Sequence, residues 1–88
     1  MRLKYNFVVR QIGGKAVAVA VGEDNAKFNG MIKLNSTGEL IFECLKNDTA
    51  ADEIAKKMCE RFSIDFDSAL NDVNECIDKF RSAGLIEE

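Results

Sequence analysis

Residues 16–21 read AVAVAV, and this strict alternation of small and branched side chains constrains the fold more than any other feature. Successive side chains of a β-strand point to opposite faces, so one face of this segment carries valines and the other alanines. We expect the valine face to pack against helices and the alanine face to leave room for a close neighbour. The preceding Gly13-Gly14 tolerates the positive φ of a two-residue hairpin. Residues 5–12, rich in aromatic and branched side chains, therefore form the expected first strand.

A short third strand and a helix follow. Residues 22–29 (GEDNAKFN) form a polar connection, and residues 30–34 (GMIKL) are the expected third strand. Asn35 is a favourable N-cap, and the apolar residues after it recur with the period of a helix. A glycine such as Gly38 costs about 1 kcal/mol relative to alanine in a helix interior. We place it in the first turn, where the cost is smaller and a close neighbour can be accommodated.

Two further helices are predicted by their caps and apolar stripes. Thr49 opens a TAAD sequence that is close to a capping box, and Asp65 is the expected cap of the last helix. Gly84 is expected to end that helix, with Leu85 folding back onto the core. The apolar stripes consist of Ala51, Ile54, Ala55, Met58, Cys59 and Phe62 in the middle helix and of Phe66, Leu70, Val73, Ile77 and Phe80 in the last helix.

The order of the elements predicts the α+β class, with one domain spanning residues 1–88. A β-meander at residues 1–34 forms a three-stranded antiparallel sheet, and residues 35–88 form a three-helix bundle, winged helix-turn-helix-like. A length of 88 residues with 47% hydrophobic and 31% charged side chains suits one soluble domain. No apolar run approaches the roughly 18 residues that cross a bilayer. The start, MRLKYNFVV, is not typical of a signal peptide, so we expect a cytoplasmic protein.

The cysteine and histidine content argues against most catalytic and metal-binding chemistry. Cys44, Cys59 and Cys76 form no C-x-x-C pair, and the chain contains no histidine. This weighs against a zinc site, a redox pair and a disulfide framework. Each cysteine falls on an apolar helical face, as a small buried hydrophobe would. Without histidine a Ser–His or Cys–His nucleophile is impossible, so we expect no catalytic residue, no metal and no cofactor.

The arrangement of the helices also suggests a winged-helix DNA-binding domain, whose last helix would enter the major groove. Residues 65–84 carry five acidic side chains against two basic ones. Phosphates repel such a helix, because affinity for nucleic acid comes from the neutralisation of phosphates by Lys and Arg. We therefore expect no nucleic-acid partner, and a winged-helix nucleic-acid binder stays an alternative.

Charge is divided unevenly along the chain. Residues 1–34 carry six Lys or Arg and two acidic residues, a net charge of +4, which leaves −7 for residues 35–88 because the total is −3. A basic sheet would then lie beside an acidic helical layer. This polarity is explained either by attraction between the two layers or by a groove that orients a charged partner.

The run LNSTGELIFECL at residues 34–45 resembles the L-N-x-T-G/A-x-x-I-W-x-L-L signature of PqqD-like proteins. The resemblance extends over nearly the whole chain, and its combined order and spacing are more specific than any single motif. It continues through VRQIGGKAVAVAVG and FNGMIKLN upstream and through Thr49, Glu53-Ile54-Ala55, Ile64-Asp65, Asp72-Val73, Cys76-Ile77, Phe80 and Gly84-Leu85-Ile86 downstream. Phe42 stands where tryptophan is common in the family, and Cys76 stands where a larger apolar residue is usual. The smaller Cys76 could re-shape a groove and change its specificity.

The resemblance implies a non-catalytic peptide chaperone, also called a recognition element for ribosomally synthesised, post-translationally modified peptides (RiPPs). Such proteins bind the leader of a precursor peptide as an added strand at the third β-strand, against the third helix. They present it to a modifying enzyme, often a radical S-adenosylmethionine (SAM) protein. The implied partners are thus a leader peptide and a radical SAM enzyme. We expect neither nucleic acid nor a membrane as a partner. We expect the protein to be a monomer or a weak homodimer.

Strand addition requires an exposed edge, because unpaired N–H and C=O groups there can pair with an extended peptide. The predicted peptide-binding residues on the third strand are Met31, Ile32 and Lys33, and those on the last helix are Asp72, Cys76 and Lys79. Two alternatives stay open. Lys33 can instead protect the strand edge from pairing, and Cys76 can instead only widen the apolar core stripe of the last helix. A docking or dimerisation module, in which the edge pairs with its own copy, is a further alternative function.

Overall fold

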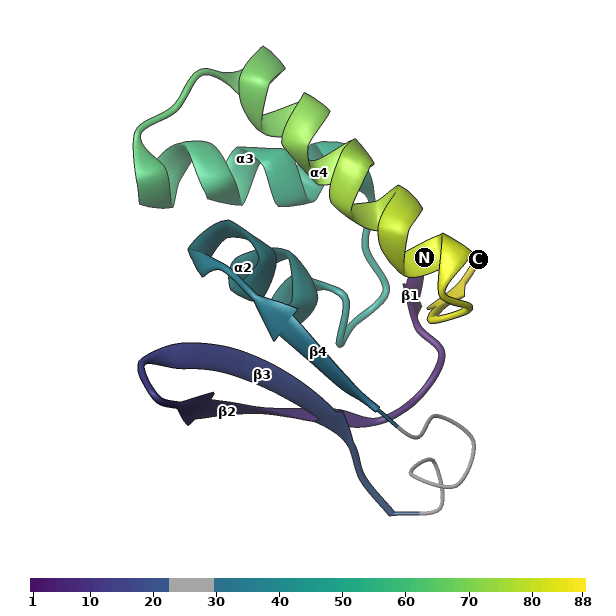
Figure 1. Cartoon of the computed structure of the whole chain (residues 1–88). Coiled ribbons are helices and arrows are strands. Elements are labelled where there is room, and N and C mark those ends of the chain that lie inside the picture. Colours follow the sequence, from purple (N-terminus) through teal and green to yellow (C-terminus); the bar gives the residue numbers. More distant parts are fainter. Residues whose placement is uncertain (23–29) are drawn as a thin grey trace.

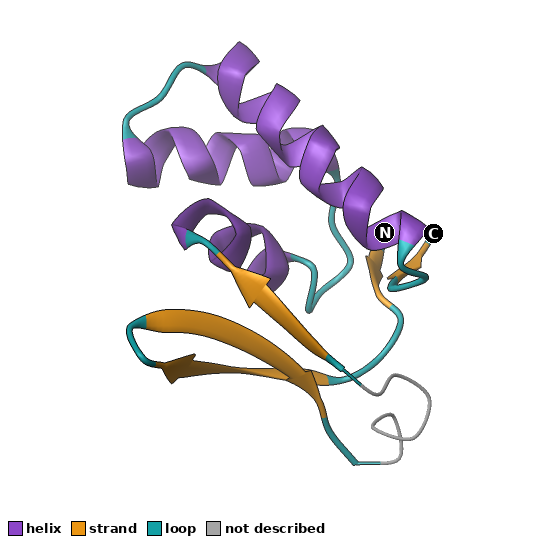
Figure 2. Ribbon diagram, viewed as in Figure 1, coloured by secondary structure: helices purple, strands orange, loops and turns teal. Residues whose placement is uncertain are grey.

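The computed structural model of the chain describes residues 1–22 and 30–88 (Figure 1). Its main sheet has the order β2-β3-β4, and both pairs of neighbouring strands are antiparallel. The strands are β2 (Phe7–Ile12), β3 (Lys15–Ala20) and β4 (Met31–Leu34), and the helices are α2 (Ser36–Cys44), α3 (Ala51–Phe62) and α4 (Phe66–Ser82). The helices lie on one side of the sheet, with α2 nearest to it (Figure 2). The predicted α+β class is confirmed. Of the polar connection predicted at residues 22–29, residues 23–29 lie outside the described residues.

The hairpin between β2 and β3 forms as its glycines predict. Gly13 and Gly14 have φ values of 59° and 79°, which a two-residue turn of the mirror-image type requires at both positions. Ile12 and Lys15 face each other directly across this turn. The tight turn leaves no freedom for the two strands to slip, so it sets the register of β2 against β3.

The sheet presents its alanine face to the helices, so the prediction for the valine face is wrong. Ala16, Ala18 and Ala20 are 5%, 0% and 1% exposed, and all three belong to the hydrophobic core. Val17 and Val19 point to the opposite face, because side chains alternate along the strand. The physical reason is volume, since a face of small side chains lets large rings from other elements approach the sheet closely.

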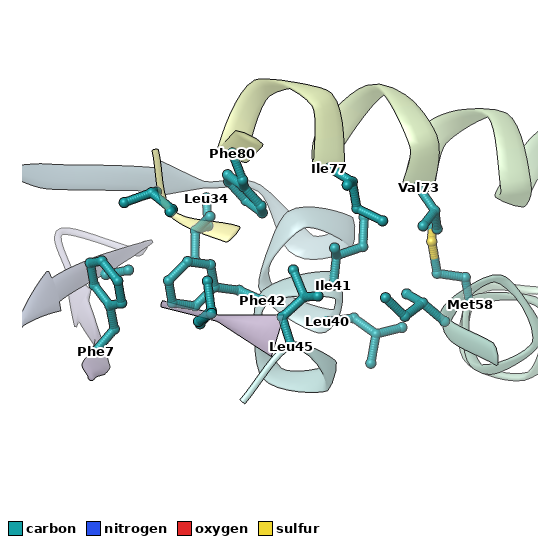
Figure 3. Packing of buried hydrophobic residues seen from close by; sticks show 14 of the residues in the cluster. Phe7, Leu34, Leu40, Ile41, Phe42, Leu45, Met58, Val73, Ile77 and Phe80 are labelled. Carbon is teal, nitrogen blue, oxygen red and sulfur yellow. The ribbon is translucent and has the colours of Figure 1, made fainter. Parts of the chain in front are cut away.

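Three phenylalanine rings fill that space. Phe42 of α2 is fully buried, and its ring meets Phe7 of β2 edge-on with 5.2 Å between centroids and an interplanar angle of 79°. On its other side, the Phe42 ring meets Phe80 of α4 at 5.5 Å and 82°. Aromatic pairs favour such edge-to-face contacts. The stack therefore joins the sheet to the first and last helices, and Leu34 of β4 lies beside it (Figure 3).

A second, two-stranded pairing brings the two ends of the described chain together. β1 (Arg2–Leu3) pairs antiparallel with β5 (Ile86–Glu87), and the sequence did not predict it because two-residue strands show no periodicity. The return of the chain after α4 follows the predicted helix end. Gly84 has a φ of 77°, and Leu85 is buried and donates its N–H to the Phe80 carbonyl at 3.0 Å, as in a Schellman motif.

The predicted caps are correct for α2 and α4. The side chain of Asn35 accepts a hydrogen bond from the Gly38 N–H at 2.8 Å, and that of Asp65 accepts one from the Ser68 N–H at 3.0 Å. The bond from Ser68 also lowers the pKa of the Asp65 carboxyl, because it favours the charged form.

Two predictions at the helix starts are wrong. The N-cap of α3 is Ala50, without a capping side chain, and the Thr49 hydroxyl instead contacts a carboxylate oxygen of Glu53 at 3.2 Å. The helix begins one residue later than the TAAD pattern indicated, so Thr49 is out of reach of the first-turn N–H groups. Phe66 is the first residue of α4 and is 38% exposed rather than part of the core line.

Gly38 is explained by the cap that precedes it. A Cβ atom added at Gly38 would lie 2.9 Å from Oδ1 of Asn35, which is closer than van der Waals contact allows. The close neighbour that the sequence predicted at this turn is therefore the capping side chain itself, and a larger residue at position 38 would displace it.

This crowding predicts an energetic coupling between the two positions. Asn35→Ala should destabilise the protein by about 1 kcal/mol through loss of the cap. Gly38→Ala alone should change stability little, because its gain in helix propensity is offset by damage to the cap. In the Asn35→Ala background, Gly38→Ala should stabilise by up to about 1 kcal/mol. Urea unfolding of the four proteins of this cycle checks the coupling, and strictly additive changes would contradict it.

The ring stack predicts a second, larger effect. Phe42→Ala should lower the free energy of unfolding by about 3–5 kcal/mol, because it opens a cavity between the sheet and two helices. Phe42→Leu is the matched control, and it should cost clearly less because it keeps most of the apolar volume. Chemical denaturation measures both, and equal losses would show that the ring contacts are unimportant.

Candidate functional site

β4 forms one edge of the sheet in the described part of the chain, and the register shows which of its backbone groups point outward. In an antiparallel ladder, alternate residues of a strand direct their N–H and C=O groups to opposite sides. Val21 donates its N–H to the Asn6 carbonyl at 3.0 Å, directly beyond the pair that ends β3. The odd-numbered residues of β3 therefore pair with β2, and the even-numbered ones pair with β4.

The same alternation continues into β4. Ile32 and Leu34 stand opposite Ala18 and Ala16, so their backbone groups are directed at β3. The N–H and C=O groups of the alternate residues, including Lys33, are directed away from the sheet. Of the predicted strand residues, Met31 and Lys33 thus have outward backbone groups and Ile32 does not.

A groove of about 830 Å³ lies beside the end of β4. Three parts of the fold form its walls: the β2–β3 hairpin, the passage from β4 into α2, and one face of α4. The lining residues are Gln11, Gly14, Lys15 and Ala16, then Lys33 to Glu39 with Ile41, and finally Asp72, Glu75, Cys76, Lys79 and Phe80. The groove therefore lies at the C-terminal end of β4, between the tip of the hairpin and α4.

The structure brings together most of the predicted site residues. Lys33, Asp72, Cys76 and Lys79 line the groove. Ile32 is half-buried and packs against the core, and Met31 is 67% exposed at the far end of the strand, so neither contributes to the lining. The three residues predicted on α4 thus share the flank that lines this groove, and whether they bind a peptide stays a prediction.

The opposite flank of α4 has other contacts. Arg81 lies 3.1 Å from a carboxylate oxygen of Asp78 and 2.7 Å from one of Glu88, and Asp67, Asn71 and Asn74 are exposed. This flank meets solvent and the end of the chain, and none of these residues belongs to the groove lining.

The sequence reasoning missed the contribution of the hairpin. Gln11 and Lys15 line the groove, and the Gln11 side-chain amide donates to a carboxylate oxygen of Glu39 on α2 at 3.2 Å. One signal could have revealed this position. In an antiparallel meander the start of β3 lies beside the end of β4, and Ala16 indeed stands opposite Leu34. The hairpin tip must then lie close to the start of α2.

Cys76 supplies an apolar part of the groove wall. It is partly buried and packs against the core, together with the neighbouring Phe80. Burial raises the pKa of the Cys76 thiol, and the nearby Lys79 opposes this shift. The protonated thiol is a poor nucleophile, so Cys76 acts as a small apolar surface. Cys44 and Cys59 are also partly buried and pack against the core, in line with the prediction of small apolar side chains on helical faces, and no disulfide joins the three.

The groove walls carry charges of both signs. Lys15 and Lys33 lie on the sheet side, Asp72 and Glu75 lie on α4, and Lys79 lies one turn further along α4. None of the ion pairs found among residues 1–22 and 30–88 involves these side chains.

Neither a metal-ion cluster nor a membrane-spanning helix is found among the described residues. Among them, no group of three or more His, Cys, Asp or Glu side chains is placed to hold a metal ion. None of the helices in this part of the chain is both long and apolar enough to cross a membrane.

Comparisons with known proteins support the fold. The family model described as Coenzyme PQQ synthesis protein D (PqqD) matches residues 15–86. Two solved structures cover 99% of this chain at 18% identity. The first is TbiB1 in complex with the TbiA(beta) leader peptide, of which 95% is covered with a TM-score of 0.73. The second is lasso peptide synthetase B1 complexed with the leader peptide, of which 96% is covered with a TM-score of 0.71. A search of curated proteins finds no significant match.

The burial of Cys76 predicts slow reaction with thiol reagents. In a variant with Cys44→Ser and Cys59→Ser, the remaining thiol should react with iodoacetamide more slowly in the folded protein than in urea at the same pH. A raised pKa leaves less thiolate at neutral pH, and burial limits access. The rate should increase as the pH rises toward the thiol pKa. Equal rates in the folded and unfolded chain would show that Cys76 is freely accessible.

Proposed function

The chain belongs to the family of coenzyme PQQ synthesis protein D, and from this premise we propose that it is a non-catalytic peptide chaperone. It binds the leader of a ribosomally made precursor peptide and presents it to a modifying enzyme. The observation that carries this proposal is the open backbone edge of β4, with outward groups at Met31 and Lys33, beside a groove that α4 closes on its far side.

The leader adds to the sheet as a further strand next to β4. Its backbone pairs with the outward N–H and C=O groups of Met31 and Lys33, each bond contributing roughly 0.5–1.5 kcal/mol net. Alternate leader side chains then point toward α4 and the groove, where Cys76, Ile41 and Phe80 offer apolar surface. Burial of two or three apolar side chains adds roughly 1.5–3 kcal/mol each.

These gains are opposed by association costs of roughly 4–15 kcal/mol. The balance supports weak to moderate affinity, which suits a chaperone that must select a leader and later release it. No proton transfer or bond cleavage is needed for this role. The chain's contribution is therefore a surface for the leader, and the partner enzyme supplies the chemistry.

Both similar structures hold a leader peptide, which supports the same class of ligand here. For the enzyme partner, the resemblance to PqqD-like proteins supports a radical SAM protein. A cytoplasmic location and a monomeric or weakly dimeric state stay predictions of the sequence. The acidic face of α4 argues against nucleic acid as the ligand, because the Asp72 and Glu75 carboxylates would repel phosphates.

The open edge predicts the effect of removing one backbone N–H. Lys33→Pro should abolish leader binding, because proline cannot donate to an added strand but is tolerated on the outer side of an edge. Lys33→Ala keeps the N–H and should retain most of the affinity. Ile32→Pro should instead destabilise the sheet, since the Ile32 N–H is directed at β3. Titration of each protein with a synthetic leader from a precursor encoded beside its gene, followed by amide NMR, measures these effects.

In wild-type protein the same titration should shift the amides of residues 31–34 and α4 most. Shifts confined to residues outside β4 and α4 would contradict the proposal, as would unchanged binding by a folded Lys33→Pro variant. Sedimentation tests the alternative function, in which the β4 edge pairs with a second copy of the chain. A dimer that saturating leader does not dissociate would favour docking of a second copy at the edge.

A further inference from the structure

We propose that the groove selects leaders by the order of their charges, with a basic side chain first, an apolar one next and an acidic one last. This inference rests on the proposed function and names the leader class that the same groove accepts. It is carried by the placement of Asp72, Glu75, Cys76 and Lys79 along one face of α4. All four residues line the groove, and their spacing in the sequence is that of a single helical stripe.

The stripe places opposite charges at its two ends. Asp72 and Lys79 are seven residues apart, which corresponds to about 10 Å along a helix. Cys76 lies between them, one turn from each. Glu75 adds a second carboxylate beside Cys76, one turn before Lys79, and Lys33 of β4 lines the groove on the other wall. An extended peptide between the walls therefore meets the Asp72 carboxylate first, then the Cys76 surface with Glu75 beside it, and then the Lys79 ammonium group.

The position of each end relative to β4 follows from the packing. Phe80 lies beside Leu34, the last residue of β4, whereas Val73 lies two turns away beside Met58 (Figure 3). The two elements also run in opposite directions, with the C-terminal end of α4 nearer the start of β4 (Figure 1). Lys79 is therefore level with the end of β4, and Asp72 lies beyond it.

The direction of the peptide gives the order of the charges. Antiparallel pairing is favoured over parallel pairing, and it continues the pattern of this sheet. An antiparallel strand next to β4 enters from the end beyond Leu34 and leaves past Met31. Its earlier residues pass Asp72, its middle residues pass Glu75 and Cys76, and its later residues pass Lys79. A basic residue is thus favoured first and an acidic residue last.

The separation of the two charges follows from strand geometry. About 10 Å corresponds to about three residues of extended chain at roughly 3.3 Å each. Only alternate side chains face α4, so the charged residues must be two or four positions apart. A separation of four leaves a middle side chain on the same face, opposite Cys76. The preferred segment is therefore basic-x-apolar-x-acidic.

Two synthetic peptides of identical composition test this order. Both are acetylated and amidated, and their sequences are TVKTLTEVT and TVETLTKVT. Wild-type protein should bind the first about fivefold more tightly by NMR titration, as expected for partly exposed ion pairs. The difference should decrease in 0.5 M salt, because salt screens such charges. Equal affinities, or tighter binding of the second peptide, would overturn the inference.

A charge exchange on α4 gives an independent readout. The double variant Asp72→Lys/Lys79→Asp keeps the net charge and should prefer TVETLTKVT. The matched control Asn71→Lys/Asn74→Asp places the same charges on exposed positions outside the groove and should keep the wild-type preference. An unchanged preference in a folded exchange variant would also overturn the inference.

The outcomes separate this inference from the proposed function. If both peptides shift the amides of Met31 and Lys33 equally, strand addition stands and charge selection fails. If neither peptide shifts them but the cognate leader does, charge selection fails and strand addition stands, and if the cognate leader does not shift them either, both fail.

Discussion

The contact of Phe42 with two other rings holds the functional surface together. Phe7 anchors this residue to the sheet and Phe80 anchors it to α4. The distance between β4 and α4, and hence the width of the groove, depends on that stack. The stack is possible only because the sheet turns its alanines inward, since valines in their place would occupy the volume of the rings. The alternation of small and large side chains in β3 thus influences the width of the groove between β4 and α4.

A second constraint comes from the hairpin and acts on the backbone. The Gly13-Gly14 turn sets the register of β2 against β3, and alternation carries that register into β4. The outward groups are consequently those of Met31 and Lys33. Function at this edge would need no special side chain on the strand, because any residue except proline provides an N–H. The side chains that we propose to discriminate between ligands lie on α4, where Asp72, Cys76 and Lys79 line the groove.

Much of the fold could be predicted from local patterns. The turn glycines, the Asn35 and Asp65 caps and the Gly84 helix end are short-range features, and each prediction is confirmed. Asp72, Cys76 and Lys79, which the sequence predicted as peptide-binding residues on α4, all line the groove, and their role in binding stays a prediction. The sequence analysis missed the β1–β5 pairing, and it was wrong about the burial of Phe66 and about which face of β3 meets the helices. Each of these features depends on partners distant in sequence. That all 88 residues form one domain stays a prediction.

The sequence by itself determined the three strands of the main sheet, the three helices, their order and the polarity of charge, because periodicity, capping and turn chemistry act over a few residues. The tertiary structure alone decided which face of the sheet is buried and that the hairpin tip joins the groove. An alternating strand has two faces, and local preference cannot choose between them. That choice was made by the rings of Phe7, Phe42 and Phe80, which pack best over the face with the smallest side chains.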